Sequence, residues 1–347
     1  WTRHFQKEFK TLRGYDMLPY LPVLAGRIVD SREVSNRFLY DFRKTVSDLI
    51  ADRMYARFAE MAHERGLLVH PESGGPHSAP IDGLKCLGRN DVPTGEFWVR
   101  ANTHRVRVDE RLFIKQSSSA AHIYGKRFVA GEGPTSVGPQ WERAPKDLKN
   151  VFDRNFCEGI NRFFWHCFTN SPKEFGIPGN EYYAGTHLNP NTTWWNKSGA
   201  WTRYLSRGSY LLSQGLFQAD VCIYYGDDVP NFVLWKRTLD DLGPGYDYDE
   251  CNAEVILMRM SVKDGNIVLP DGMTYRVLRL PDRNAITLEV LQKIEQMVKN
   301  GATIVGPKPA ISTGLKAYPE SDRKVQEIAD KLWGECDGKT ITENHYG

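Results

Sequence analysis

Apolar residues recur every three or four positions between residues 31 and 65, and this spacing predicts a long amphipathic helix. The recurring positions are Val34, Phe38, Phe42, Val46, Leu49, Ile50, Met54 and Phe58. Ser31 provides an N-cap for this helix, and Gly66 provides a stop at its C-terminal end. The short apolar run at residues 67–70 is typical of a central strand, so this part of the chain predicts a helix followed by a strand.

The same helix–strand unit repeats downstream. A helical pattern at residues 111–124 leads into an apolar run at 127–130, and another at 144–158 leads into 160–165. Repeated strands separated by helices are typical of parallel α/β folds. We therefore expect a (β/α)8-type barrel over residues 1–217. A complete barrel needs about 250 residues, so its first strand or strands are expected upstream of this chain.

A second pattern begins at residue 218 and predicts a separate α/β domain over residues 218–347, with its C-terminal end cut. Strands are expected at 220–225, 275–280 and 302–305, with a helix at 287–300 before the last of them. This order predicts an open parallel sheet of the Rossmann or flavodoxin-like type. The segment contains no GxGxxG sequence, so no nucleotide cofactor is expected.

Composition narrows the class of protein further. Hydrophobic residues make up 41% and charged residues 25%, which are ordinary globular values. The net charge of +2 disfavours a nucleic-acid partner, and no apolar run is long enough for a membrane span. The six cysteines lack metal-site or disulfide spacing. Aromatic residues reach 12%, which favours a flat ligand with polar edges.

Three glutamates lie at or near the ends of predicted strands, where the active site of a barrel is built. Glu72 follows the apolar run at 67–70, Glu132 follows the run at 127–130, and Glu96 is expected in a loop at the barrel mouth. Glycoside hydrolysis needs this kind of set, because one carboxylic acid protonates the leaving oxygen while a second carboxylate activates water or attacks the sugar. These three residues are the predicted catalytic candidates.

Aromatic and histidine side chains near these positions are predicted to bind a sugar, since rings pack on its apolar faces and imidazoles bond its hydroxyls. The predicted binding residues are Trp98, His122, Trp165, His166, His187, Trp194 and Trp195. Trp201 completes a tryptophan cluster that is interpreted as a site wall. The acidic run at 246–250 is interpreted as a solvated loop, so metal ligands are not assigned from the pattern.

Seven segments in order resemble glycoside hydrolase family 106, the α-L-rhamnosidases. They lie at residues 14–27, 35–50, 66–76, 91–98, 120–136, 159–172 and 193–215. The segments YRVLRLPDRNAIT and NGATIVGPKP extend the resemblance into the region after the barrel. Proteins of this family are much longer than this chain.

The resemblance implies an inverting exo-α-L-rhamnosidase that acts on rhamnose-containing glycans, often with bound calcium. It also implies a bacterial enzyme that is secreted or periplasmic. Carried over by position, Glu96 and Glu132 are the first choices for the acid and base pair and Glu72 is the reserve, with the two roles left open.

Two other readings stay open. The same barrel could belong to a retaining glycosidase for another sugar, which the separation of the carboxyl groups would distinguish from an inverting enzyme. The aromatic groove could instead belong to a carbohydrate-binding protein without catalytic activity. Turnover of an aryl rhamnoside separates that reading from the two enzymes.

Overall fold

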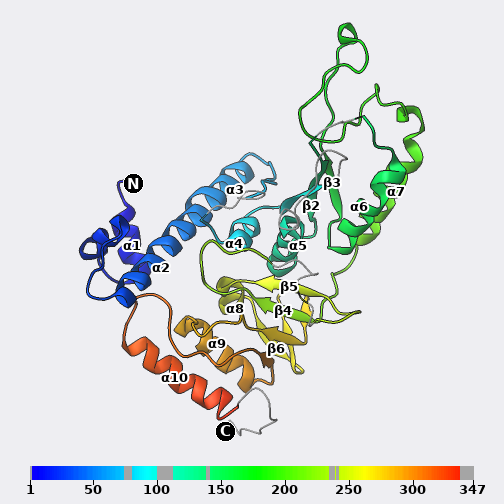
Figure 1. Cartoon of the computed structure of the whole chain (residues 1–347). Coiled ribbons are helices and arrows are strands. Elements are labelled where there is room, and N and C mark those ends of the chain that lie inside the picture. Colours follow the sequence, from blue (N-terminus) through cyan, green and yellow to red (C-terminus); the bar gives the residue numbers. More distant parts are fainter. Residues whose placement is uncertain are drawn as a thin grey trace.

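The chain folds into helices and parallel sheets, as a computed structural model of residues 2–73, 80–99, 112–137, 141–233, 239 and 242–336 describes it (Figure 1). The α/β class expected from the sequence is therefore confirmed. None of the helices in these ranges has both the length and the hydrophobicity needed to cross a bilayer.

The predicted long N-terminal helix is confirmed, with one irregular turn. It comprises α2 (Arg32–Leu49) and α3 (Ala56–His63), joined by a π-helical turn, η2 (Ile50–Tyr55). The Ser31 hydroxyl caps α2 by accepting a hydrogen bond from the backbone N–H of Val34 at 3.0 Å. The shorter helices before it are α1 (Phe5–Arg13) and the 3-10 helix η1 (Leu18–Ala25). Aromatic side chains of α1 and α2 form the core of this helical layer.

Three parallel strands form the first sheet, in the order β1-β2-β3. They are β1 (Thr94–Trp98), β2 (Ala130–Thr135) and β3 (Arg162–Trp165). The surrounding helices are α4 (Gly83–Gly88), α5 (Leu112–Tyr124), α6 (Pro145–Cys157) and α7 (Gly199–Leu212). Helices α5 and α6 connect successive strands, as the repeated pattern predicted, and these strands form a three-stranded parallel sheet.

Two predicted strands are corrected. Residues 67–70 form no strand, and Leu67 and Leu68 are 58% and 73% exposed, so this apolar run is not buried in a sheet. The run at 127–130 only leads into β2, which begins at Ala130 and continues past Glu132. Glu96 likewise lies within a strand, β1, and not in the predicted loop.

The second sheet has four parallel strands in the order β10-β9-β4-β5. The strands are β4 (Val221–Tyr224), β5 (Tyr248–Cys251), β9 (Val277–Arg279) and β10 (Thr303–Val305), and the helices are α8 (Ala253–Met258), α9 (Leu288–Lys299) and α10 (Glu320–Trp333). The predicted strand at 275–280 is divided, because its first residue belongs to a separate antiparallel sheet. That sheet consists of β6 (Ser261–Lys263), β7 (Asn266–Val268) and β8 (Thr274–Tyr275).

The acidic run at 246–250 is not a solvated loop, because its second half forms the buried strand β5. Asp249 and Glu250 are both 0% exposed. Asp249 is compensated by the His122 ring at 2.9 Å and by the hydroxyl of Tyr275 at 3.0 Å. The Lys115 ammonium lies 3.6 Å from the same carboxylate. Burial of the Asp249 carboxylate is tolerated because each of its oxygens accepts hydrogen bonds.

Helix α5 is shared by the two parallel sheets. Its residues Ala120 and Ile123 belong to the core under the second sheet, and Ile114 and Ala121 belong to the core of the first. Figure 1 shows α5 between the strands of the two sheets. The packing therefore crosses residue 217, where the sequence predicted the division between domains.

Candidate active site

The first sheet places two glutamates in one row. Glu96 on β1 is the register partner of Glu132 on β2, and Glu132 in turn pairs with Phe164 on β3. Register partners in parallel strands point to the same face of the sheet, and neighbouring strands lie about 4.7–4.9 Å apart. The two carboxylates are therefore neighbours because of the strand register.

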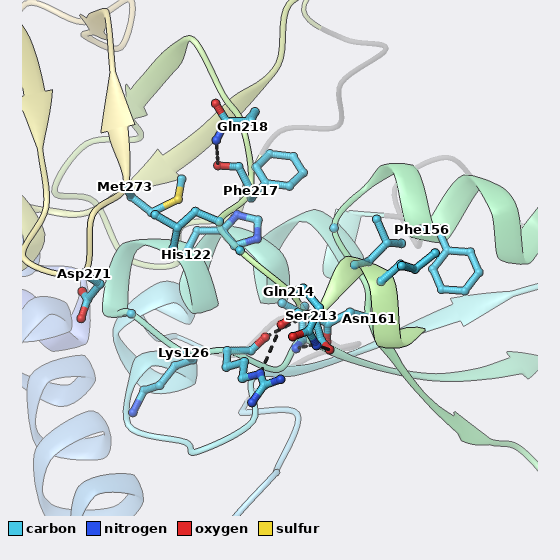
Figure 2. Close-up of a pocket in the computed structure, with 18 of the residues that line it drawn as sticks. His122, Lys126, Phe156, Asn161, Ser213, Gln214, Phe217, Gln218, Asp271 and Met273 are labelled. Carbon is cyan, nitrogen blue, oxygen red and sulfur yellow. Dashed lines mark hydrogen bonds between the residues drawn. The ribbon is translucent and has the colours of Figure 1, made fainter. Parts of the chain in front are cut away.

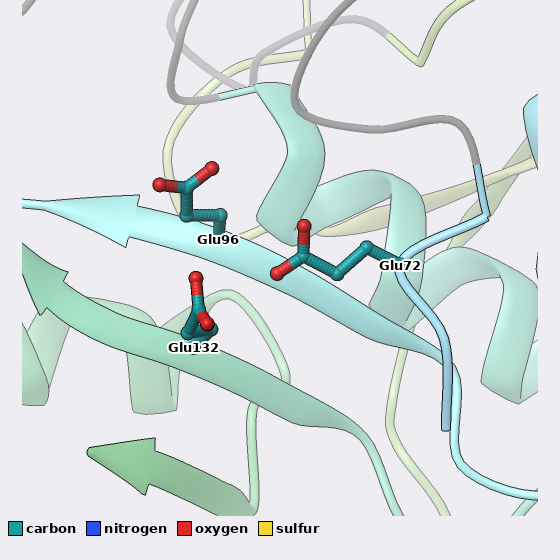
Figure 3. Close-up of side chains that lie close together, drawn as sticks. All are labelled: Glu72, Glu96 and Glu132. Carbon is teal, nitrogen blue, oxygen red and sulfur yellow. The ribbon is translucent and has the colours of Figure 1, made fainter. Parts of the chain in front are cut away.

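Glu72 reaches the same place from a loop, and Asn90 holds that loop. The Asn90 amide donates hydrogen bonds to the carbonyl of Pro71 at 2.6 Å and to the hydroxyl of Ser73 at 2.8 Å. Asn90 is only 1% exposed, so these bonds are sheltered from water. Figure 3 shows Glu72 extending from the loop toward Glu96 and Glu132. The loop on both sides of Glu72 is thus fixed by one buried side chain.

The three carboxylates form one cluster. An oxygen atom from each of Glu72, Glu96 and Glu132 lies within 4.8 Å of the other two. Glu96 is buried, whereas Glu72 and Glu132 are partly exposed. The structure thus brings together the three glutamates that the sequence singled out at separate strand ends.

The electrostatics of the cluster favour a proton on Glu72. Burial, together with the charges of Glu132 and Glu96, raises the pKa of Glu72 to about 8. A carboxyl group beside two carboxylates resists losing its proton, because like charges at this distance repel. Glu72 is therefore a carboxylic acid at neutral pH, which is the state that a general acid needs.

The cluster also suits a hard cation. Calcium binds six to eight oxygen ligands at about 2.3–2.6 Å, and it prefers carboxylates. Three carboxylate oxygens within 4.8 Å of one another match the spacing of ligands around such an ion. A cation would also offset the repulsion that raises the pKa of Glu72.

Two of the predicted histidines lie at the carboxyl end of the same sheet. His166 follows β3, and its Nδ1 lies 3.0 Å from the hydroxyl of Thr135 at the end of β2. His187 is buried, and its Nε2 accepts a hydrogen bond from the backbone N–H of Tyr182 at 3.0 Å. Burial lowers the pKa of His187. Both imidazoles therefore lie near the strand ends, and each already has a hydrogen-bond partner within the protein.

The predicted tryptophans divide between the strand ends and the core. Trp98 ends β1, whereas the ring of Trp165 stacks on Phe152 and its N–H donates to the carbonyl of Thr186 at 2.8 Å. Trp194 packs against the same core and donates to the Arg143 carbonyl. Trp195 lies in the 3-10 helix η5 (Trp195–Lys197), with its ring beside Phe168.

Trp201 does not form part of a site wall. It lies on α7, is 6% exposed, and packs edge-on against Phe152 in the core of the first sheet. The tryptophan cluster after residue 193 is therefore largely a structural feature. The alternation of tryptophan with asparagine and glycine suggested a site wall, but the buried face of α7 begins within the same run.

His122 lies away from the glutamates. It borders a cavity of about 710 Å³ that is also lined by Val129 and Asn161, which precede β2 and β3 (Figure 2). This is the amino end of the strands, opposite the end at which Thr135 and His166 lie. Its Nδ1 contacts Asp249, and its ring stacks on Phe217. The predicted sugar contact of His122 is therefore separate from the carboxylate cluster.

Three residues near the cluster were not predicted from the sequence. Asn90 positions the Glu72 loop, and no local pattern marks it. Cys167 directly follows His166, and burial together with the charge of Glu132 raises the pKa of its thiol. The ring of Tyr182 contacts His166 from a distant part of the same loop. The position of Cys167 after a strand was a usable signal, whereas the other two depend on tertiary contacts.

Parallel strands with acidic residues clustered toward their carboxyl ends define a class of proteins in which glycoside hydrolases are common. The chain belongs to glycoside hydrolase family 106, because the model of this family, described as alpha-L-rhamnosidase, matches residues 1–347.

Individual relatives agree with this assignment. A rhamnosidase structure from Novosphingobium sp. PP1Y is 31% identical, with a TM-score of 0.87 over 97% of this chain and 32% of that chain. A curated protein of Formosa agariphila, provisionally named a beta-glucuronidase, is 38% identical over 334 residues, which are 96% of this chain and 28% of the relative. This chain thus spans about a third or less of these two proteins.

A more distant structure shares the fold alone. A GH42 beta-galactosidase is 12% identical, with a TM-score of 0.51 over 93% of this chain and 52% of that chain. At this identity the match supports the α/β architecture and carries no information on substrate.

Proposed function

We propose that the protein containing this chain is a glycoside hydrolase that removes terminal α-linked L-rhamnose from glycans or glycosides. The observation that carries the proposal is the cluster of Glu72, Glu96 and Glu132 beside the strand ends of a family 106 chain. An inverting course is part of the proposal and rests on the family. The oxygens of the cluster lie within 4.8 Å of one another. This is nearer to the about 5–5.5 Å of a retaining pair than to the about 6.5–9.5 Å of an inverting pair, so the anomer of the first product decides between the two courses.

The geometry supports a revised choice of roles among the three glutamates. Glu72 is the general acid, because its raised pKa keeps the proton that the leaving oxygen requires. Glu132 is the base, because its side chain is partly exposed, so that water can reach it beside Glu96. Glu96 is the buried third carboxylate, whose charge helps to keep Glu72 protonated.

Calcium fits the same cluster and is proposed as its cation. Glu72, Glu96 and Glu132 would supply oxygen ligands, and the bound ion would neutralise charge and offer a contact for sugar hydroxyls. Glu72 would then be an ionised ligand, so this use of the cluster is an alternative to its role as the general acid. The chain's own residues still have to hold and move the proton. Asn90 keeps the Glu72 loop in place, and the strand register keeps Glu96 and Glu132 on one face.

The incomplete barrel is also a proposal. The first sheet has an open edge at β3 among the described residues, and a strand from elsewhere in the longer protein would pair there to continue the barrel. The open sheet after residue 218 would then be the domain that follows the barrel. A secreted or periplasmic location in a bacterium is proposed from the family alone.

A second candidate substrate deserves a direct comparison, because one relative carries the provisional name beta-glucuronidase. The test uses the longer natural protein with an aryl α-L-rhamnoside and an aryl β-D-glucuronide. We expect turnover of the rhamnoside, and NMR of the first product should show the inverted anomer. Turnover of the glucuronide alone would show that the substrate is a β-D-glucuronide and not the proposed rhamnoside. A retained anomer would establish the retaining alternative, and absence of turnover with retained sugar binding would support the binding protein.

A further inference from the structure

The second parallel sheet has a reversal in strand order. The chain forms β4, places β5 on one side of it, and then returns to place β9 and β10 on the other side. In open α/β sheets ligands bind in the crevice at the carboxyl ends of the strands where the order reverses. The reversal here falls between β4 and β9, and the residues that follow these strands are therefore the place to search.

A cavity lies at this end of the second sheet. Its volume is about 380 Å³, within the range of about 300–1,000 Å³ typical of small-molecule sites. Asp227 follows β4, Thr287 precedes α9, and Thr313 and Ser321 come from the segment after β10. Helix α2 closes the other side with Tyr40 and Asp41. Every element that should flank the crevice thus contributes a polar side chain.

The polar groups of the cavity are buried and only partly paired. Asp227 is 8% exposed and accepts a hydrogen bond from the backbone N–H of Thr287 at 3.2 Å, with the hydroxyls of Tyr224 and Thr287 beside it. Ser321 is 2% exposed, and its hydroxyl finds no hydrogen-bond partner within the described ranges. A buried hydroxyl without a partner is unfavourable, so a ligand hydroxyl that bonds it gains affinity.

The charges that line the cavity disfavour an anion. Asp41 and Asp227 are both buried. The cations at the rim are already paired, Arg13 and Lys44 with Asp48 and Lys316 with Glu289. Asp227 also accepts from the backbone N–H of Thr287 at the start of α9, a place that would otherwise attract phosphate.

We propose that this cavity is a second binding site, specific for a neutral sugar unit. Leu257 and Leu288 provide an apolar surface for the sugar ring, and the carboxyl and hydroxyl groups of Asp227 and Ser321 bond its hydroxyls. The site is built from different elements than the carboxylate cluster. This binding proposal therefore does not depend on the proposed hydrolysis.

Hydrogen–deuterium exchange on the 347-residue chain, with L-rhamnose as the probe, tests this proposal. L-Rhamnose at millimolar concentration is expected to slow exchange at residues 226–233, 287–291 and 312–322. Asp227→Ala and Ser321→Ala should each raise about tenfold the sugar concentration that gives half-maximal protection. This change corresponds to about 1.4 kcal/mol in binding free energy. Asp228→Asn is the matched control, because Asp228 is the next residue and does not border the cavity.

The variants also separate this site from the catalytic one. Glu132→Gln should leave protection of the three segments unchanged while altering exchange around β2. Protection of the three segments by adenosine monophosphate or inorganic phosphate in place of the sugar would overturn the proposal, as would protection that survives both Asp227→Ala and Ser321→Ala. No protection of these segments by rhamnose, galactose or glucose would also overturn it, whatever the outcome at the carboxylate cluster.

Discussion

At the scale of single residues, Glu72 links the site to the stability of the protein. Its pKa is about 8 in the folded chain against an ordinary value of 4.5. The folded state therefore holds this proton more tightly than the unfolded state, and the free energy of unfolding falls as the pH rises from about 4.5 to about 8. Glu72→Gln cannot ionise. In the presence of a chelator its melting temperature should exceed that of the wild type at pH 9 and match it at pH 4.

Thermal unfolding over this pH range gives the comparison, with Glu60→Gln on the exposed face of α3 as the control. Added calcium should flatten the pH dependence of the wild type, because a bound cation lowers the pKa of Glu72. If wild type and Glu72→Gln lose stability in parallel between pH 4 and pH 9, the raised pKa is wrong. If calcium leaves the wild-type curve unchanged, the cluster is not its site.

Asn90 gives a second test at the same scale. Asn90→Ala removes the hydrogen bonds to Pro71 and Ser73, and the loss of a buried bond typically costs about 1–3 kcal/mol. Urea unfolding should show this loss. If the loop positions Glu72, the variant also loses kcat in the longer protein while KM changes little. An effect on stability with full kcat would limit Asn90 to a structural role.

At the scale of elements, β5 shows how charge can be buried in a strand. Asp249→Asn keeps the shape of the side chain but removes the charge that faces His122 and Lys115. Leaving Lys115 with Asp247 as its remaining acidic partner at 3.6 Å should cost about 3 kcal/mol or more in the free energy of unfolding. Asp264→Asn, at an exposed turn, is the control. Equal stability of the two variants would contradict this account of β5.

Several elements could be predicted because their signals are local. Apolar spacing and the Ser31 cap predict helix α2, and the same spacing with Gly301 predicts α9. Strand β5 could not be predicted, because its carboxylates are compensated by Lys115 and His122 on a helix far away in sequence. The apolar run at 67–70 was wrongly predicted to be a buried strand, because its pattern is apolar but nothing among the described residues covers Leu67 and Leu68.

The candidate site was predictable in part for similar reasons. Glutamates near strand ends converge because parallel strands share one carboxyl end, so the pattern singled out both Glu96 and Glu132, although Glu96 was expected in a loop and lies within β1. The hydrogen bonds of Asn90 and the proton on Glu72 depend on contacts across the fold. The sequence did not reveal that His122 lies at the other end of the sheet from the glutamates, because a histidine at the end of a helix can face either end.

At the scale of the whole molecule, helix α5 joins the two sheets into one cooperative unit. Ile123 is 0% exposed in the core under the second sheet. Ile123→Ala should lower the free energy of unfolding by about 2–5 kcal/mol. Far-UV circular dichroism and tryptophan fluorescence should shift together, in one transition. Met258→Ala, at a side chain that is 78% exposed, should leave the curve unchanged. Two separated transitions would instead support independent domains divided near residue 217.

The central claim is that the glutamate cluster cleaves a glycosidic bond, and the leaving-group dependence of turnover in the longer protein tests it most directly. Glu72→Gln should reduce kcat/KM by about 10²–10⁴ for a rhamnoside with a poor leaving group and much less for a dinitrophenyl rhamnoside, because a good leaving group hardly needs the proton. Glu132→Gln should reduce kcat/KM for both rhamnosides by similar large factors. Glu60→Gln should reduce kcat/KM for neither of them. If Glu72→Gln and Glu132→Gln both stay within about threefold of the wild type on both substrates, the cluster is not the catalytic site.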